Sequence, residues 1–207
     1  MKREVNPQDT GRAEAFTMWM SSPMPMVTLV KTLDVSRLLK VGKRKGFRFT
    51  MLMCWCIGKA ASKTEEFFTL PEDGRLFRYD TLAINVIVEN KKGGINSCDI
   101  PFSDELQQFN RDYLTFTAQA AEECRSSTLD DSMVIGTSAM IQTELDCIVN
   151  QYTDKFCNPM VMWGKYRCRL FKTTLTVSFQ FHHTQMDGAH AARFLEHLQE
   201  EINMLAK

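Results

Sequence analysis

The spacing of apolar residues changes from period two to helical spacing near the C-terminal end of the chain. Residues 173–181 alternate hydroxyl or amide side chains with apolar ones, which predicts a strand. Apolar residues then recur three and four positions apart between residues 195 and 205, which predicts a helix over residues 189–205. His182-His183 and the turn-forming Asp187-Gly188 lie between them. The sequence therefore predicts a strand that ends in two adjacent histidines, then a turn and a helix.

The rest of the chain mixes helical and strand patterns without a repeating βα unit. Residues 49–67 are apolar almost all round, which is typical of a buried helix. This mixture predicts an α+β fold in a single domain over residues 1–207. Other helices are expected over residues 6–20 (capped by Asp9 or Thr10), 35–41 and 105–125. Strands are expected over residues 26–33, 68–70, 76–78, 82–89, 95–100, 133–145, 160–165 and 166–170.

The composition excludes two classes of partner. The 207 residues are 44% hydrophobic, which is enough for one well-buried core. Lys and Arg total 25, as do Asp and Glu, so no net charge attracts nucleic acid or an anionic membrane. The longest apolar run, residues 50–57, is far shorter than the roughly 20 residues of a membrane span. A local basic run over residues 40–48 reads as a solvated loop or helix end.

Cysteine usage indicates a reducing compartment. The chain has seven cysteines, an odd number, with no repeated C-x-x-C pair and no secretory signal at its beginning. Cys54 and Cys56 lie in an apolar stretch, where they are expected to pack as small hydrophobic residues. We therefore expect reduced thiols and a cytoplasmic location.

The adjacent histidines are the best candidates for chemistry. Neighbouring residues on a strand point to opposite faces, so one of His182 and His183 faces a site while the other packs. A neutral imidazole is a good general base near pH 7. Two other readings are a structural histidine and a metal site formed by His183, Asp187 and His190. The spacing of that set matches no metal pattern that we can derive.

A resemblance to a known family enters at these residues. The sequence of residues 182–188, with the apolar positions of residues 191–199, resembles the His-His-x-x-x-Asp-Gly signature of chloramphenicol acetyltransferases. The family's other regions follow in its order and approximate spacing, so the resemblance covers nearly all of the chain: residues 12–16, residues 51–61, Ser138-Ala139 and residues 159–166. The signature is shared with dehydrogenase-complex acyltransferases that use lipoyl groups and with condensation domains.

The resemblance implies a fold and an assembly. The fold would be a two-layer sandwich of a mixed β-sheet with helices on one side. The protein would form a homotrimer in which His183 of one subunit faces the acceptor pocket of its neighbour. Acetyl-CoA, the co-substrate, would enter from the opposite end of a tunnel, and no metal would take part.

The resemblance also implies roles for particular residues. His183 would be the general base that takes a proton from an acceptor hydroxyl, with no acyl-enzyme, and Ser138 would steady the oxyanion. Asp187 would pair with an N-terminal arginine, for which Arg12 is the candidate, although a positive charge is unusual near the start of a helix. Gly188 would permit a tight turn. Lys165 and Trp163 would contact the coenzyme.

The expected acceptor wall departs from the family pattern. Trp19 and Met24 stand where enzymes that act on chloramphenicol have a wall rich in Tyr or Phe, and Met162 replaces a threonine expected to hold a water molecule. Methionines line a site without specifying one ligand. The acceptor is therefore chloramphenicol or another alcohol. The alternatives are an acyltransferase with a thiol acceptor such as dihydrolipoamide, and a non-catalytic trimeric binding protein.

Overall fold

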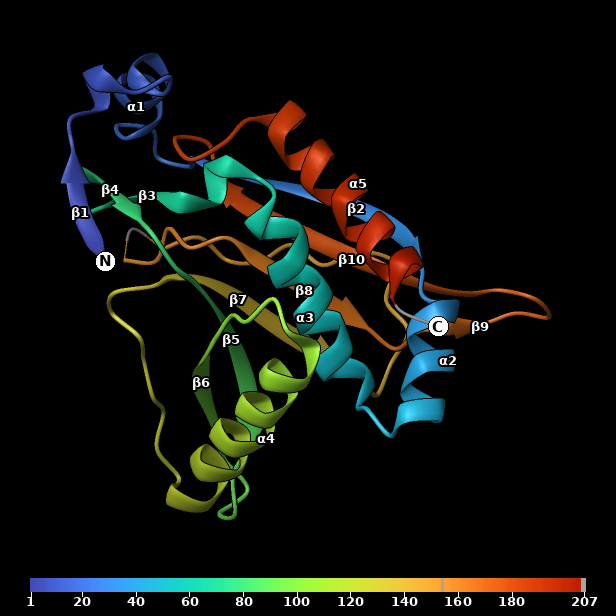
Figure 1. Ribbon diagram of the computed structural model, residues 1–207. Coiled ribbons are helices and arrows are strands. Elements are labelled where there is room, and N and C mark those ends of the chain that lie inside the picture. Colours follow the sequence, from blue (N-terminus) through green and yellow to red (C-terminus); the bar gives the residue numbers. More distant parts are fainter. Residues whose placement is uncertain (154, 206–207) are drawn as a thin grey trace.

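A computed structural model describes residues 1–153 and 155–205 of the chain (Figure 1). The larger of two sheets has seven strands: β2 (Met26–Asp34), β5 (Leu82–Glu89), β6 (Ile95–Pro101), β7 (Met133–Met140), β8 (Met160–Gly164), β9 (Arg167–Cys168) and β10 (Thr173–His182). Six of them follow the order β2-β10-β8-β7-β5-β6, and β9 pairs with β10. The sheet is mixed because β7 runs parallel to both β5 and β8, while its other pairs are antiparallel.

A small antiparallel sheet lies at one end of the molecule, beside the N-terminus (Figure 1). Its strands, in the order β1-β4-β3, are β1 (Lys2–Val5), β3 (Thr69–Glu72) and β4 (Arg75–Tyr79). The strands expected over residues 68–70 and 76–78 are confirmed as β3 and β4, which form a hairpin. Its turn uses Asp73 and Gly74, both with positive φ, which is the backbone conformation that glycine adopts without strain.

Helices α2 (Ser36–Lys45), α3 (Phe49–Ser62), α4 (Leu106–Glu123) and α5 (Gly188–Met204) lie on one side of the large sheet. The short helix α1 (Ala13–Trp19) lies instead at the N-terminal corner, near β1 (Figure 1). Two 3₁₀ turns are η1 (Pro7–Asp9) and η2 (Glu65–Phe68). Figure 1 shows α3, α4 and α5 across this face, where α4 packs on β5 and β6, and α5 on β2. The predicted α+β class and the two-layer arrangement are confirmed.

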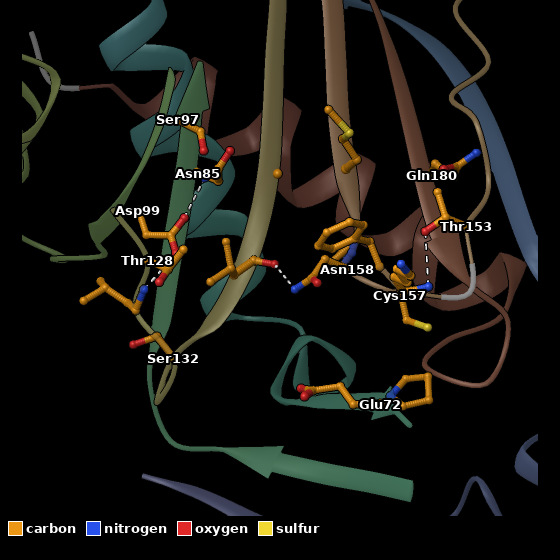
Figure 2. A pocket seen from close by; sticks show the side chains of 18 of the residues that line it. Glu72, Asn85, Ser97, Asp99, Thr128, Ser132, Thr153, Cys157, Asn158 and Gln180 are labelled. Atoms are coloured by element: carbon orange, nitrogen blue, oxygen red, sulfur yellow. Dashed lines mark hydrogen bonds between the residues drawn. The ribbon is translucent and has the colours of Figure 1, made fainter. Parts of the chain in front are cut away.

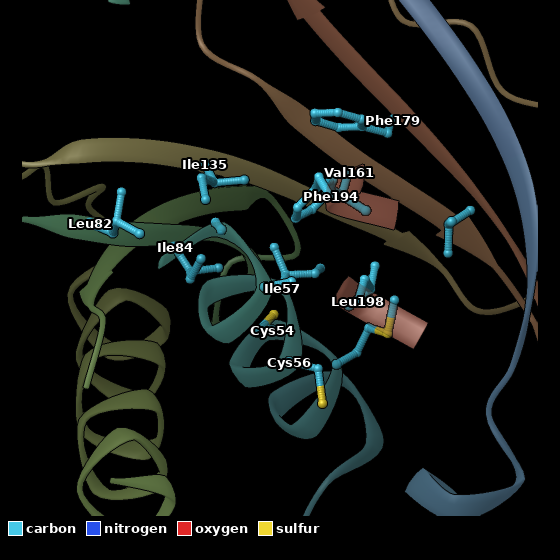
Figure 3. Close-up of a cluster of buried hydrophobic side chains, with 14 of the residues drawn as sticks. Cys54, Cys56, Ile57, Leu82, Ile84, Ile135, Val161, Phe179, Phe194 and Leu198 are labelled. Carbon is cyan, nitrogen blue, oxygen red and sulfur yellow. The ribbon is translucent and has the colours of Figure 1, made fainter. Parts of the chain in front are cut away.

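Helix α3 is buried because it lies between the sheet and the flanking helices. Figure 3 shows its Cys54 and Ile57 among the side chains of the core, near Ile84 and Ile135 of the sheet. Cys54 is fully buried, and burial raises the pKa of its thiol to about 12, so this cysteine packs as a small hydrophobic residue, as predicted. The seven cysteines are all free thiols.

The face without helices carries polar residues from several strands. On β10, Val177, Phe179 and Phe181 are buried, and strand alternation places Ser178 and Gln180 on the opposite face. Residues 141–153 cross that face: the Gln180 amide Nε2 donates to the backbone carbonyl of Asn150 at 3.1 Å. We call this side of the sheet the open face.

Several predicted elements have other bounds in the structure. The helix expected over residues 35–41 extends to Lys45, and the strand expected over residues 166–170 is reduced to β9. The helix expected over residues 6–20 is divided into η1 and α1; Asn6 caps η1 through the Gln8 N–H, so neither Asp9 nor Thr10 has the predicted capping role. The helix expected to reach residue 67 ends at Ser62, where a 3₁₀ turn follows. The strand expected over residues 133–145 ends at Met140 because the chain turns back over β8, bringing the Thr143 carbonyl against Gly164.

No helix in the described part of the chain is long and apolar enough to cross a membrane.

Candidate active site

His183 lies directly after the last residue of β10. Its backbone N–H donates to the carbonyl oxygen of Pro25 at 2.8 Å, just before β2 begins. The strand pairing also sets this position, because His182 is the register partner of Met26. The backbone of His183 is therefore anchored by the pairing of two neighbouring strands.

The imidazole of His183 has a fixed orientation. It stacks on the indole of Trp19 with ring centroids 4.3 Å apart and 5° between the planes, and its edge faces Phe181. Such an aromatic pair contributes about 0.5–1.5 kcal/mol beyond its buried area. Nδ1 is enclosed and has no hydrogen-bond partner among the described residues. Nε2 is therefore the ring nitrogen left for a substrate.

His182 packs inside the protein, which confirms that the two neighbouring histidines separate. It is 2% exposed, and its Nδ1 accepts a hydrogen bond from the Thr184 N–H at 3.1 Å. Burial lowers the pKa of His182 to about 4, with a smaller effect from the neighbouring His183. His182 is therefore neutral at pH 7 and carries no charge into the site.

Arg12 holds the turn that follows β10. Its guanidinium donates to the carbonyl oxygens of His183 at 2.7 Å and Thr184 at 3.0 Å, and to Asp187 Oδ2 at 3.2 Å. A guanidinium presents its donors in a rigid planar fork, which suits three acceptors on one turn. This arrangement explains the positive charge near the start of a helix: Arg12 is the N-terminal cap residue of α1 but bonds to a distant turn.

Asp187 caps helix α5. Its side chain accepts the His190 N–H, and His190 Nδ1 lies 3.1 Å from Asp187 Oδ1. Burial alone would raise the pKa of Asp187, but the charge and N–H of His190, together with Arg12, outweigh it and hold the pKa below its usual value. The other ring nitrogen of His190, Nε2, lies 3.1 Å from Glu66 Oε1. The start of α5 is thus tied to both Arg12 and η2.

The expected need for glycine at position 188 does not appear in the structure. Gly188 is the first residue of α5 and does not have a positive φ. A Cβ added there would meet no atom within 4 Å. The turn before α5 is shaped by the Asp187 cap and by Arg12, so an alanine fits the single chain equally well.

Ser138 lies on the open face, well away from His183 of the same chain. Its register partner on β8 is Met162, whose own partner on β10 is Ser178. His183 is five residues beyond Ser178, and β7 is two strands away from β10. Strand geometry therefore separates the two residues by roughly 20 Å, so one chain does not bring both to a single reacting atom.

The open face contains a cavity of about 700 Å³. Its lining includes Asn85, Asp99, Gly136, Asn158, Met160 and Gln180. Figure 2 shows Asn85 and Asp99 at one side of the cavity and Gln180 at the other. Gly136 lies two residues before Ser138 on β7, and Met160 lies two residues before Met162 on β8. The cavity therefore borders Ser138, the expected oxyanion donor.

Two residues expected to contact ligands are placed differently. Trp163 is completely buried in the core and pairs in register with Val177 on the helix-covered side. A direct contact between Trp163 and the coenzyme is therefore wrong for this chain. Lys165, by contrast, follows β8 at the surface and is exposed. Met24 is 63% exposed, while Met162 is buried beside Ser138.

The described structure does not support the alternative in which His183, Asp187 and His190 bind a metal ion. Among residues 1–153 and 155–205, no group of three or more His, Cys, Asp or Glu side chains is arranged to hold a metal ion.

We expect Arg12→Met to destabilise the protein much more than Arg193→Met. Arg12 is 16% exposed and would leave three acceptors without their donor, at a cost of roughly 2–4 kcal/mol, or about 5–15 °C in Tm. Arg193 is half exposed and reaches only Glu66, at 3.5 Å, so its loss should change Tm by about 2 °C or less. Thermal unfolding of both variants measures this, and equal shifts would contradict the role given to Arg12.

Comparisons with known proteins agree with this geometry. The family model described as chloramphenicol acetyltransferase matches residues 4–199. Chloramphenicol acetyltransferase 3 of Escherichia coli is 26% identical over 188 residues, 87% of each chain. The chloramphenicol acetyltransferase of Bacillus pumilus is 25% identical over 196 residues, covering 91% of this chain and 88% of the other.

Solved structures share the fold. A chloramphenicol acetyltransferase superposes with a TM-score of 0.85 at 18% identity, over 98% of this chain and 100% of the other. A probable dihydrolipoamide acetyltransferase from Listeria monocytogenes superposes with a TM-score of 0.69 at 12% identity, over 99% of this chain and 96% of the other.

The mixed sheet with helices on one face and a histidine at the end of its long strand is that of the CoA-dependent acyltransferases, and the protein is an enzyme of this class. Because the family model covers nearly the whole chain, the chain belongs to the chloramphenicol acetyltransferase family.

Sequence reasoning missed the polar groups of the cavity. Asn85 is a polar residue within the largely apolar strand β5, and Asp99 is its register partner on β6. Gln180 lies two positions before His182 on the same strand. A polar residue on the buried part of a strand is a usable signal, but only the strand pairing shows that these residues share a cavity.

Proposed function

We propose that the protein transfers the acetyl group of acetyl-CoA to a hydroxyl of a small molecule, with His183 as general base. The single observation that carries this proposal is the His183 ring, stacked on Trp19 with Nδ1 enclosed and Nε2 left for a substrate. Membership of the chloramphenicol acetyltransferase family supports the same reaction.

The reaction needs one proton acceptor and no covalent enzyme intermediate. His183 Nε2 takes the proton of the acceptor hydroxyl as its oxygen attacks the thioester carbonyl carbon. The tetrahedral intermediate then collapses, the carbon–sulfur bond breaks, and His183 gives the proton it had taken to the departing CoA thiolate, which leaves as the thiol. Because the base ends the cycle neutral, no second proton donor is required.

Ser138 is the proposed donor to the oxyanion of that intermediate. A hydroxyl placed there contributes typically about 10²- to 10³-fold in rate. Because roughly 20 Å separates Ser138 from His183 within one chain, the roles proposed here need the two residues to come from different subunits. We therefore propose a homotrimer in which each site lies between two chains, with a head-to-tail interface that closes into a ring.

The neighbouring residues receive supporting roles. Arg12 and Asp187 position His183 by holding the turn after β10. Trp19 and Met24 would form one wall of the acceptor site and Met162 the opposite wall, beside Ser138 of the partner subunit. Lys165 would contact the phosphates of acetyl-CoA. We keep the cytoplasmic location, where acetyl-CoA is available, as part of the proposal.

Release of free CoA tests the proposal. The purified protein is mixed with acetyl-CoA and chloramphenicol or another hydroxylated compound, and free thiol is followed with a disulfide dye. We expect saturable release that depends on the hydroxyl acceptor. Dihydrolipoamide, which itself reacts with the dye, is assayed by mass spectrometry of its acetylated product. Transfer to dihydrolipoamide alone would replace the alcohol by a thiol acceptor, and no transfer to any acceptor would reject the proposal.

A further inference from the structure

Three amide side chains of the open-face cavity have their NH₂ groups bonded and their carbonyl oxygens unbonded. Asn85 Nδ2 donates to Asp99 Oδ1 at 2.7 Å (Figure 2). Asn158 Nδ2 donates to a backbone carbonyl of β7 at 2.9 Å, and Gln180 Nε2 donates to a backbone carbonyl of the crossing segment at 3.1 Å. Each of these partners is an acceptor only, so the NH₂ end of each amide is fixed. The three carbonyl oxygens accept no hydrogen bond from the described residues and remain for a ligand.

Asp99 adds a carboxylate to this set of acceptors. It is 4% exposed and lines the cavity, with Oδ1 accepting from Asn85 and Oδ2 from the Leu129 N–H at 2.9 Å. No lysine, arginine or histidine among residues 1–153 and 155–205 pairs with it. A carboxylate accepts about four hydrogen bonds, and burial of its charge without a cation is costly. Asp99 therefore has both unused acceptor capacity and an uncompensated charge.

The charged lining of the cavity is negative on balance. Four carboxylates and two lysines line it in the described part of the chain: Glu72, Asp73, Asp99, Asp130, Lys2 and Lys155. Lys2 is already bonded to Glu72. The surplus of carboxylates favours a cationic ligand.

Little in the lining suits an aryl group. Its described aromatic residues are Tyr79 and Phe156. The Tyr79 hydroxyl is bonded to Glu72, and Phe156 is 70% exposed. The aryl group of an acceptor such as chloramphenicol would therefore find little aromatic surface to pack against in this cavity.

We propose that this cavity binds the acceptor and that the acceptor is a polyhydroxylated amine, an amino sugar in chemical class. Its ammonium group pairs with Asp99, and its hydroxyls donate to the carbonyl oxygens of Asn85, Asn158 and Gln180. This inference rests on the proposed acetyl transfer to a hydroxyl. Asp99 lies on β6, two strands away from Ser138 and two residues further back along the strand direction, which gives a separation of roughly 12 Å. This separation is similar to the length of two linked sugar rings. The cavity volume is also in the range of small-molecule sites.

Three disaccharides of one scaffold test the amine directly. They are the β-1,4-linked glucosamine disaccharide, its di-N-acetylated form and cellobiose, which differ only in an ammonium, an amide or a hydroxyl at the same position. Calorimetric titration without acetyl-CoA is expected to give the diamine at least tenfold tighter binding than cellobiose, from a charge-assisted hydrogen bond to a buried carboxylate. Diamine binding that is no tighter than that of the two neutral compounds would overturn the inference.

Ser97→Lys, with Ser97→Gln as its control, tests where the amine binds. Ser97 lines the cavity on the same face of β6 as Asp99, and its hydroxyl takes no part in the Asp99 contacts. The lysine should reduce the diamine preference to less than threefold, whereas the glutamine should retain it. An unchanged preference in Ser97→Lys would place the amine elsewhere and overturn the assignment.

Thiol release with the same compounds and with chloramphenicol separates the two proposals. Tight diamine binding without acetyl transfer to any compound would reject the acetyltransferase reaction and leave the amine site standing. Transfer to chloramphenicol, with no tighter binding of the diamine, would support the acetyltransferase reaction and reject the amine site.

Discussion

Replacing His183 by alanine should lower kcat/KM for acetyl transfer by roughly 10²- to 10⁴-fold, the usual contribution of a positioned general base. The neighbouring Arg12 and Asp187 are not expected to replace His183 as the base. Arg12 is permanently charged, and the Asp187 carboxylate is held in an ion pair with it. The thiol-release assay with a saturating acceptor measures this loss.

The fold should survive this change. Alanine keeps the His183 N–H bond to Pro25 and the carbonyl bond to Arg12, and removes the ring contacts with Trp19 and Phe181. We expect a Tm decrease of about 2–6 °C. His197→Ala is the matched control, because it removes an imidazole from the same region of the sequence but from a ring that contacts Thr64. Full activity in His183→Ala would assign the base to another group.

The sequence was sufficient for the elements around His183 because their signals are local. The alternation of β10 and the apolar spacing of α5 lie within about 30 residues, and both elements appear close to their predicted bounds. The separation of His182 from His183 follows from strand alternation alone. The Arg12–Asp187 pair joins residues 175 positions apart, and only the family resemblance indicated it.

The prediction for Trp163 did not take into account the alternation of side chains along the strand that contains it. In the resembling stretch of residues 159–166 Trp163 stands two residues before Lys165, and both were expected to contact the coenzyme. On β8, however, Trp163 alternates with Met162 and therefore points to the helix-covered side, opposite Ser138. The alternation of side chains along β8 is a local pattern, and it is sufficient to predict that Trp163 and Met162 face opposite sides of the sheet.

The cavity is beyond sequence reasoning for a different reason. Its walls come from β5, β6, β7, β8 and β10, which are joined by a register that no local pattern specifies. The sequence predicts that residues 141–145 continue β7, but the chain leaves the strand after Met140 and residues 141–153 cross the open face instead. The amide orientations depend on these long-range contacts, so the proposed class of acceptor can be inferred only from the fold.

We also expect activity to recover when the variants Ser138→Ala and His183→Ala are combined in one oligomer. Ser138→Ala should lose roughly 10²- to 10³-fold in rate, and His183→Ala a similar or larger factor. If each site takes His183 from one chain and Ser138 from the next, a mixed trimer contains a site with both residues intact. In a closed ring that holds both variants, one interface in three joins an intact His183 to an intact Ser138, so about a third of the sites recover.

The measurement that tests the shared site most directly is therefore thiol release by the two variants, co-expressed with different tags and purified through both. The proposed trimer predicts activity of roughly a third of the unmodified enzyme, far above either variant alone. A mixture of His183→Ala with the double variant His183→Ala/Ser138→Ala is the control, since it contains no intact histidine. Activity of the mixed oligomer no higher than that of the single variants would contradict a site built from two chains.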